Sequence, residues 1–135
     1  MIFVLTIISL MNGLNVLIAD DNKNFVEAFK FILGNIEKKN LINTIYTAYN
    51  GQECLDVIKK EKVDLVFIDA DMPLMDGAQT TKKIIEYNRF IRVIAVSFHN
   101  EMEYIHKMLN AGAVNYIKKD CLNVEVILKE LEVGH

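Results

Sequence analysis

Five short apolar runs recur along the chain, at residues 16–19, 44–48, 65–68, 93–96 and 114–117. Most are rich in β-branched or aromatic residues, and several show no alternation between apolar and polar positions. Such runs are typical of strands that are buried on both faces of a parallel sheet.

Amphipathic segments separate these runs. Apolar residues recur at helical spacing in three of them: Phe25, Phe29, Ile32, Leu33 and Ile36; Ile105, Met108 and Leu109; and Val124, Ile127, Leu128 and Leu131. Segments 53–60 and 79–88 complete the series. The alternation predicts a doubly wound α/β fold, (βα)5, in which helices cover both faces of a parallel sheet in a three-layer sandwich. Five strands favour the flavodoxin-like order 2-1-3-4-5 over the six-stranded dinucleotide-binding order.

Composition adds little to this picture. With 135 residues, 52% of them apolar and 24% charged, the chain suits one globular domain with a sizeable core. A single proline and the lack of a low-complexity tract or repeat indicate no linker and no second domain. The net charge of −3 does not favour direct binding of nucleic acid.

The first ten residues form a continuous apolar run. It is too short to span a bilayer, and it has neither a basic leading segment nor a small-residue cleavage site, so we expect no signal peptide and no membrane association. Because Met11 reads as a natural start, we expect residues 1–13 to be an extension outside the core fold and residues 14–135 to form the domain. Cys54 and Cys121 fit no metal-binding spacing, and we expect a cytoplasmic protein in which both are core residues rather than a disulfide.

Polar residues follow the apolar runs where each predicted strand ends. They are Asp20 and Asp21, Asp69 and Asp71, Ser97, and the pair Lys118 and Lys119. In a parallel sheet these ends share one edge, so the side chains should meet in one small cleft. Clustered carboxylates repel one another unless they share a cation, and oxygen ligands favour Mg²⁺ or Mn²⁺. A metal, a lysine and a nucleophilic carboxylate together suit phosphoryl transfer.

Each of these residues also has a simpler interpretation. Asp20, Asp21 and Asn22 precede a predicted helix, and one of them could cap it. Asp76 before Gly77 is expected to be a turn or N-cap residue. His99 and His106 fit exposed positions at or on a helix better than metal-ligand positions. The joint occurrence of these residues on one sheet edge favours the site over the simpler interpretations.

At this point the sequence resembles the CheY-like receiver domain of bacterial two-component systems, over about residues 14–133. Four segments carry the resemblance: VLIADDN from Val16, LVFIDADMPLMDG from Leu65, VIAVS from Val93 and AGAVNYIKKD from Ala111. Receivers of the NarL type are the most similar in these motifs.

The resemblance implies a role for each matching residue. Asp69 would be the phosphoacceptor. Asp21 would bind Mg²⁺ directly with Asp20 close by, and the backbone carbonyl of Asp71 would add a ligand. Lys119 would pair with the phosphoryl group, whereas Lys118 lies one position too early in the motif.

The same resemblance implies a conformational switch rather than an enzyme. Ser97 would move toward the phosphoryl group and Tyr116 would change rotamer with it, remodelling the face formed by the fourth helix, fifth strand and fifth helix. The phosphodonor would be a sensor histidine kinase or a histidine phosphotransfer protein, and this face would suit a homodimer. We further expect Asp71 and His99 to flank the route of attacking water and so to tune the phosphoryl lifetime.

The sequence departs from the family pattern in three places. It contains no helix-turn-helix segment after the fifth helix, which fits a stand-alone receiver or a fragment of a longer regulator. Asp120 replaces the proline that follows the lysine in many receivers, which leaves the Lys119–Asp120 peptide geometry open. Asn115 replaces the usual glycine, and asparagine tolerates a left-handed backbone.

Three alternative functions fit less well. The Asp69–Ala70–Asp71 triplet also resembles the nucleophile motif of haloacid-dehalogenase-type phosphatases, but Met72–Pro73 follows it and the chain lacks room for that larger core and cap. A degenerate receiver that never takes phosphate would not need the full set of site residues. A flavodoxin-like cofactor binder would need a phosphate-cradling glycine loop, which the sequence does not show.

Overall fold

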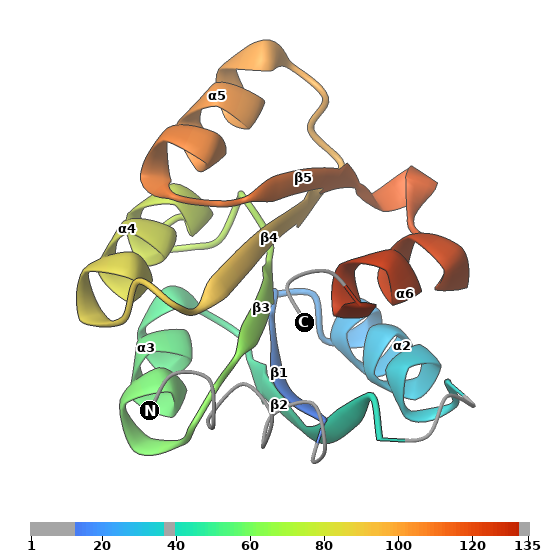
Figure 1. Cartoon of the computed structure of the whole chain (residues 1–135). Helices are drawn as coiled ribbons and strands as arrows, with labels where there is room; N and C mark the ends of the chain where they lie inside the picture. Colours follow the sequence, from blue (N-terminus) through green and yellow to red (C-terminus); the bar gives the residue numbers. More distant parts are fainter. Residues whose placement is uncertain (1–12, 37–39, 133–135) are drawn as a thin grey trace.

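The computed structural model describes residues 13–36 and 40–132. Its core is a parallel sheet of five strands in the order β2-β1-β3-β4-β5, which confirms the predicted order (Figure 1). The strands are β1 (Leu14–Ala19), β2 (Ile42–Ala48), β3 (Leu65–Ile68), β4 (Arg92–Ser97) and β5 (Asn115–Lys118). The fifth strand begins at Asn115, one residue later than expected, and Val114 before it is 58% exposed.

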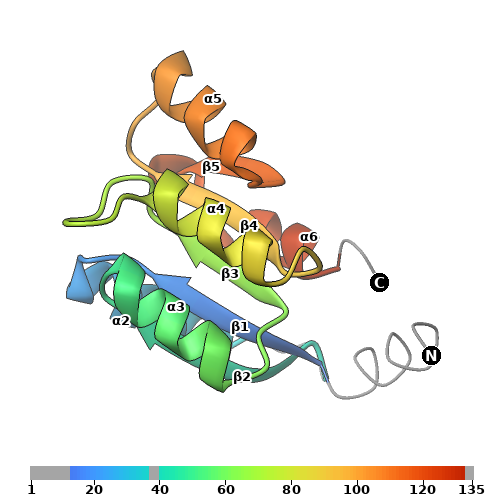
Figure 2. The same ribbon diagram turned by 90° about the vertical axis from the view of Figure 1, so that its left-hand side faces the viewer.

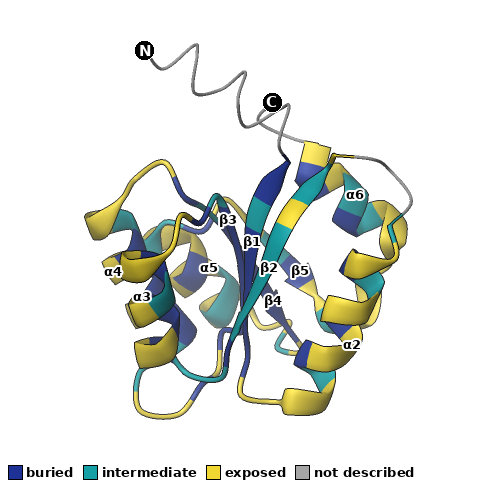
Figure 3. Ribbon diagram, turned by 90° about the horizontal axis from the view of Figure 1, so that it is seen from below, coloured by how far each residue is buried: buried dark blue, intermediate teal, exposed yellow. Residues whose placement is uncertain are grey.

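Helices cover both faces of the sheet. They are α2 (Lys23–Gly34), α3 (Gly51–Lys60), α4 (Gly77–Tyr87), α5 (Met102–Ala111) and α6 (Val124–Glu132), with a short 3₁₀ turn η1 (Lys119–Cys121) after β5. Helices α2 and α6 lie on one face, and α3, α4 and α5 lie on the other (Figures 2 and 3). The predicted three-layer α/β sandwich is therefore confirmed.

Successive residues of each central strand enter different cores. Val16 and Ile18 pack with α2 and α6, whereas Leu17 between them packs with α3 and α4 residues on the other face. The same division holds along β3 and β4. Burial on both faces explains why these strands read as unbroken apolar runs.

Side-chain caps start several helices where the sequence changes from strand to helix. The side chain of Asn22 accepts from the backbone N–H of Phe25 at the start of α2. Asp76 caps α4 in a capping box with Gln79, which confirms its predicted structural role. Burial alone would raise the pKa of Asp76, but the Gln79 N–H and the Lys107 ammonium hold it below its usual value.

The prediction for the cysteines is half wrong. Cys54 is buried in the core, but Cys121 is exposed in the 3₁₀ turn, because the chain leaves the sheet there before α6 begins; both are free thiols. The Lys119–Asp120 peptide bond is trans, and Asn115 does not use the left-handed conformation that its side chain would tolerate.

No helix within the described ranges is long and apolar enough to cross a membrane. The predicted extension falls almost entirely on residues 1–12, which lie outside the part of the chain that the structure describes.

Candidate functional site

Strand register brings the first acidic pair beside Asp69. Ala19 of β1 aligns with Ile68 of β3, so the residue that follows each strand, Asp20 or Asp69, emerges at the same edge. The backbone N–H of Asp69 donates to the carbonyl of Ala19 at 2.9 Å, which ties the two strand ends together. Both carboxylates are buried, whereas Asp21 is exposed to solvent.

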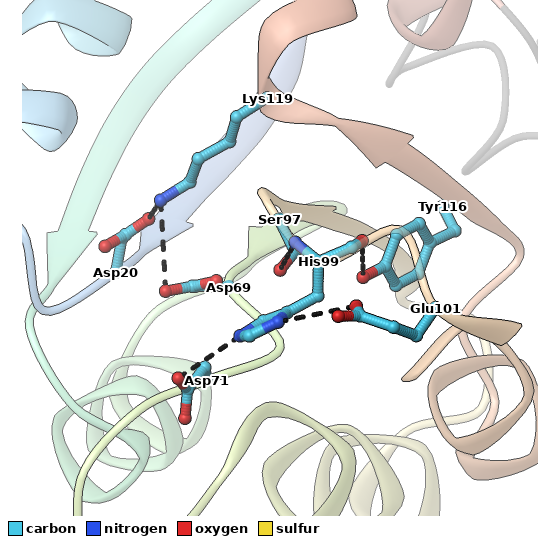
Figure 4. A network of polar contacts seen from close by, with 8 residues as sticks. All are labelled: Asp20, Asp69, Asp71, Ser97, His99, Glu101, Tyr116 and Lys119. Carbon is cyan, nitrogen blue, oxygen red and sulfur yellow. Dashed lines mark hydrogen bonds and ion pairs between the residues drawn. The ribbon is translucent and has the colours of Figure 1, made fainter. Parts of the chain in front are cut away.

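Lys119 reaches this cluster from the end of β5. Its Nζ lies 2.6 Å from Oδ2 of Asp20 and 3.9 Å from Oδ2 of Asp69, and the lysine side chain is only 5% exposed (Figure 4). Lys118, by contrast, is exposed. Within the described residues, Oδ2 of Asp20 is buried and accepts no hydrogen bond, so its close contact with Lys119 is an ion pair without hydrogen-bond alignment.

The three carboxylates fit a divalent cation. Asp20, Asp21 and Asp69 each offer an oxygen, and these oxygens all lie within 4.8 Å of one another. Oxygen donors, one of them on an exposed residue open to water, match the partly hydrated coordination that Mg²⁺ prefers. Oδ2 of Asp20 is also paired with the Lys119 ammonium, so a bound cation and the lysine would share this carboxylate.

Burial governs the protonation of Asp69. Desolvation, with a smaller contribution from the charge of Asp20, raises its pKa from 3.8 to about 6, although Lys119 and a backbone hydrogen bond from Asp71 act in the opposite direction. At neutral pH the carboxyl group is therefore mostly ionised and able to act as a nucleophile.

Asp71, two residues after Asp69, contacts His99. Nε2 of His99 lies 3.4 Å from Oδ2 of Asp71, and its Nδ1 lies 3.6 Å from a carboxylate oxygen of Glu101. The imidazole also stacks on Tyr104, with ring centroids 3.9 Å apart and planes 2° from parallel. The histidine is thus held in one orientation next to the Asp69 cleft (Figure 4).

Ser97 and Tyr116 meet at the backbone of His99. The hydroxyl of Ser97 is fully buried and accepts from the His99 N–H at 3.2 Å, while the hydroxyl of Tyr116 donates to the His99 carbonyl at 2.7 Å. Burial, the largest effect, raises the pKa of the Tyr116 phenol, and the negative charge of Asp69 adds to it. Tyr116 therefore already lies against the segment that follows Ser97.

Two aromatic residues of the site were not predicted from the sequence. Nζ of Lys119 lies 4.2 Å from the ring centroid of Phe25 and 5.1 Å from that of Phe98. The sequence places Phe25 only on the apolar face of its helix. A phenylalanine directly after Ser97 in a predicted polar cleft was the one signal that could have pointed to Phe98.

Gly77 determines how closely α4 approaches the site. A Cβ at this position would collide with the carbonyl oxygen of Asp69 and with the backbone of Ala70. The Gly77 N–H also donates to the carbonyl of Ala70 at 3.0 Å. Only glycine allows this contact, which explains the Asp–Gly pair in the sequence.

A parallel sheet in this order, with an acidic cluster and a buried lysine at its strand ends, defines a CheY-like receiver architecture. Residues 16–132 match the family described as the response regulator receiver domain, and the chain belongs to this family of two-component signalling proteins.

Relatives and solved structures agree with this assignment. The chain is 28% identical over 117 residues to the probable transcriptional regulatory protein NarL of Mycobacterium tuberculosis, covering 87% of this chain and 53% of that protein. It is 31% identical over 104 residues to the sporulation initiation phosphotransferase F of Bacillus subtilis, and this match covers 77% of the present chain and 80% of that protein. The receiver domain of the putative response regulator NarL from M. tuberculosis superposes with a TM-score of 0.79 at 28% identity. The superposition covers 92% of the present chain and 99% of that domain.

The chain spans about half the length of the first curated relatives that it matches. One similar structure is the receiver domain of Ssk1 from Saccharomyces cerevisiae in complex with the histidine phosphotransfer protein Ypd1. It superposes with a TM-score of 0.76 at 23% identity, over 90% of the present chain and 88% of that chain. This likeness supports the fold of the present chain.

Proposed function

We propose that this domain accepts a phosphoryl group on Asp69 from a phosphohistidine of a sensor histidine kinase or a histidine phosphotransfer protein in the cytoplasm. The observation that carries the proposal is the position of Asp69, which is buried, has carboxylate oxygens of Asp20 and Asp21 within 4.8 Å, and lies 3.9 Å from the Lys119 ammonium. It acts in this proposal as a switch, not as an enzyme that turns over a separate substrate.

The residues of the site would divide the chemistry as follows. An oxygen of Asp69 forms a bond to phosphorus while the bond from phosphorus to the donor histidine nitrogen breaks, and the electron pair of that bond stays on the imidazole. Mg²⁺ or Mn²⁺, held by Asp20, Asp21, Asp69 and the backbone carbonyl of Asp71, would neutralise charge on the phosphoryl oxygens. Lys119 would pair with another of these oxygens, since a buried ammonium next to Asp69 needs little reorganisation to reach it.

The signal would then pass through Ser97 and Tyr116. Ser97 would donate its hydroxyl to a phosphoryl oxygen, and the ring of Tyr116 would repack with the His99 segment to which it is hydrogen-bonded. The affected surface is formed by α5, β5 and α6, the family's fourth helix, fifth strand and fifth helix. It exposes Met102, Leu109, Val114 and Val124. We propose this surface as the site of partner binding or homodimerisation after phosphorylation.

Asp71 and His99 would control how long the phosphoryl group survives. Asp71 lies two residues after Asp69 and contacts His99, and in this proposal the pair flanks the route by which water approaches Asp69. A side-chain pair at this position restricts or directs the attacking water, and so sets the rate of hydrolysis.

The N-terminal residues 1–13 are proposed to lie outside this functional unit of residues 14–135. A protein that starts at Met11 should then have the same thermal midpoint and phosphorylation rate as the full chain. Loss of folding on this truncation would show that the segment is part of the fold.

Intact-mass spectrometry after incubation with Mg²⁺ and acetyl phosphate tests the main proposal. We expect one acid-stable, base-labile adduct of about 80 Da, the mass of one phosphoryl group, and no adduct in Asp69→Ala. Steady turnover of phosphate esters would instead support a phosphatase. Failure to form the adduct and to bind beryllofluoride would support a degenerate receiver.

A further inference from the structure

The ammonium group of Lys119 has two aromatic neighbours in addition to its carboxylate partners. Phe25 lies in the first turn of α2, and its ring centroid is 4.2 Å from Nζ of Lys119; Phe98 follows β4, and its centroid is 5.1 Å away. Both distances lie within the range in which a cation is attracted to an aromatic face. Two rings from separate elements therefore converge on one buried lysine.

The two rings differ in how firmly they are held. Phe25 is half-buried and packs edge to face on Phe29, with centroids 5.7 Å apart at 80°. Phe98 is 69% exposed, yet it lies next to a lysine whose side chain is only 5% exposed. Phe25 is thus packed against the core through Phe29, whereas Phe98 contacts the ammonium with most of its own surface exposed.

Such neighbours suit a lysine that must change partners. A buried ammonium loses much of its hydration, and a ring face compensates part of this loss without occupying an N–H donor in a directed bond. The ion pair with Asp20 lacks hydrogen-bond alignment, and Asp69 is 3.9 Å away. The ammonium thus lies among two carboxylates and two aromatic rings, with Asp69 already within 3.9 Å.

We propose that Phe25 and Phe98 are positioning residues that hold the Lys119 ammonium beside Asp69 through their aromatic faces. This inference rests on the proposed function, because the phosphoryl group on Asp69 is the partner that the positioned lysine would take. Phe98 is the residue on which to test it, since an exposed side chain can be changed without loss of the core.

The first measurement needs no phosphate. In protein labelled with ¹³C-lysine, the Hε protons of Lys119 should be shifted upfield by the ring currents, relative to those of exposed Lys118. Phe98→Leu should remove part of this shift, and Phe98→Tyr should keep it. An Hε resonance of Lys119 that matches Lys118, or that does not respond to Phe98→Leu, overturns the proposal.

The second measurement is the rate of phosphorylation by acetyl phosphate with Mg²⁺. We expect Phe98→Leu to slow it about three- to fivefold, as loss of one cation–π contact implies, and Phe98→Tyr to restore it. Phe90→Leu is the matched control, because Phe90 is 72% exposed and has Arg89 5.1 Å from its ring but belongs to the turn after α4. Its rate should equal that of the wild type.

The outcomes separate the two proposals. If Phe98→Leu is phosphorylated as fast as the wild type, or if Phe98→Tyr is phosphorylated as slowly as Phe98→Leu, the aromatic face of Phe98 does not position Lys119. The proposed phosphorylation of Asp69 is not affected by that result. If the wild type takes no phosphoryl group, the proposed function fails, and the lysine resonances alone decide whether the rings hold Lys119.

Discussion

The ammonium nitrogen of Lys119 lies 2.6 Å from Oδ2 of Asp20. The nearest partner of the lysine is thus a carboxylate of the proposed metal site and not the proposed phosphoacceptor, Asp69, from which it is 3.9 Å away. A metal cation bound to Asp20 would share the negative charge of this carboxylate with the Lys119 ammonium. Metal binding and the position of the lysine should therefore be coupled.

Removal of this ammonium should strengthen metal binding. We expect Lys119→Ala to bind Mg²⁺ about five- to twentyfold more tightly than the wild type, because a positive charge next to one ligand has been removed. Isothermal titration calorimetry well above the pKa of Asp69 measures this, with Lys118→Ala, a change at the exposed neighbour, as the control. Weaker or equal binding by Lys119→Ala would contradict the expected coupling.

Ionised Asp69 should destabilise the metal-free fold. Burial raises its pKa from 3.8 to about 6, so between these values the folded state binds more protons than the unfolded state and stability falls as the pH rises. Asp69→Asn should therefore be more stable than the wild type at neutral pH, by on the order of 2 kcal/mol, and the gain should disappear below about pH 4.

Urea denaturation in EDTA across this pH range tests the expectation. Asp56→Asn, which changes an exposed carboxylate of α3, should show no such pH-dependent gain. A stabilisation of Asp69→Asn that is the same at acidic and neutral pH would rule out ionisation as its cause.

Gly77 and Gly34 should respond to alanine in opposite directions. A Cβ at Gly77 meets the backbone of Asp69 and Ala70, so Gly77→Ala should lower the free energy of unfolding by about 2–4 kcal/mol and slow phosphorylation. A Cβ at Gly34, the last residue of α2, meets nothing within 4 Å, so Gly34→Ala should stabilise by about 0.5 kcal/mol. Thermal and urea denaturation measure both; a neutral Gly77→Ala would mean that α4 can move away from Asp69 at no cost.

Glu130 connects α6 to strands β4 and β5 of the sheet. Its carboxylate pairs with Arg92 at 3.1 Å and accepts from Nδ2 of Asn115 at 2.6 Å, and the residue is 8% exposed. Glu130→Ala should cost about 2–3 kcal/mol because it removes an acceptor shared by two strands. Lys107→Ala breaks the ion pair between Lys107 and Asp76. Because the Lys107 side chain is 60% exposed, this change should lower the free energy of unfolding by less than about 1 kcal/mol. Equal losses in urea denaturation would refute this ranking.

Asp71 should affect the lifetime of the phosphorylated state. Because its carboxylate contacts His99 and the pair is proposed to flank the route of attacking water, Asp71→Asn should weaken the pair and speed hydrolysis about two- to fivefold. Decay of the adduct after removal of the donor, followed by intact mass, gives the rate constant, and Asp56→Asn again serves as the control. An unchanged rate would show that this pair does not flank the route of the attacking water.

Much of the site could be predicted because strand ends in a parallel sheet share an edge whatever the details of packing. Asp20, Asp69, Ser97 and Lys119 each follow an apolar run, so strand order alone brings them together. The choice of Lys119 over Lys118 came from the motif, and the structure shows the first buried and the second exposed. Their catalytic and metal-binding roles remain proposals for the experiments above.

By itself, then, the sequence determined the strands, the helices, their order and the residues at the strand ends, because each depends on local periodicity and on alternation along the chain. Only the tertiary structure decided that Lys119 pairs with Asp20, that Phe25 and Phe98 face its ammonium, and that Cys121 is exposed. These contacts join residues far apart in the chain, or depend on where a turn leaves the sheet. No local pattern encodes such distances, since the packing of whole elements sets them.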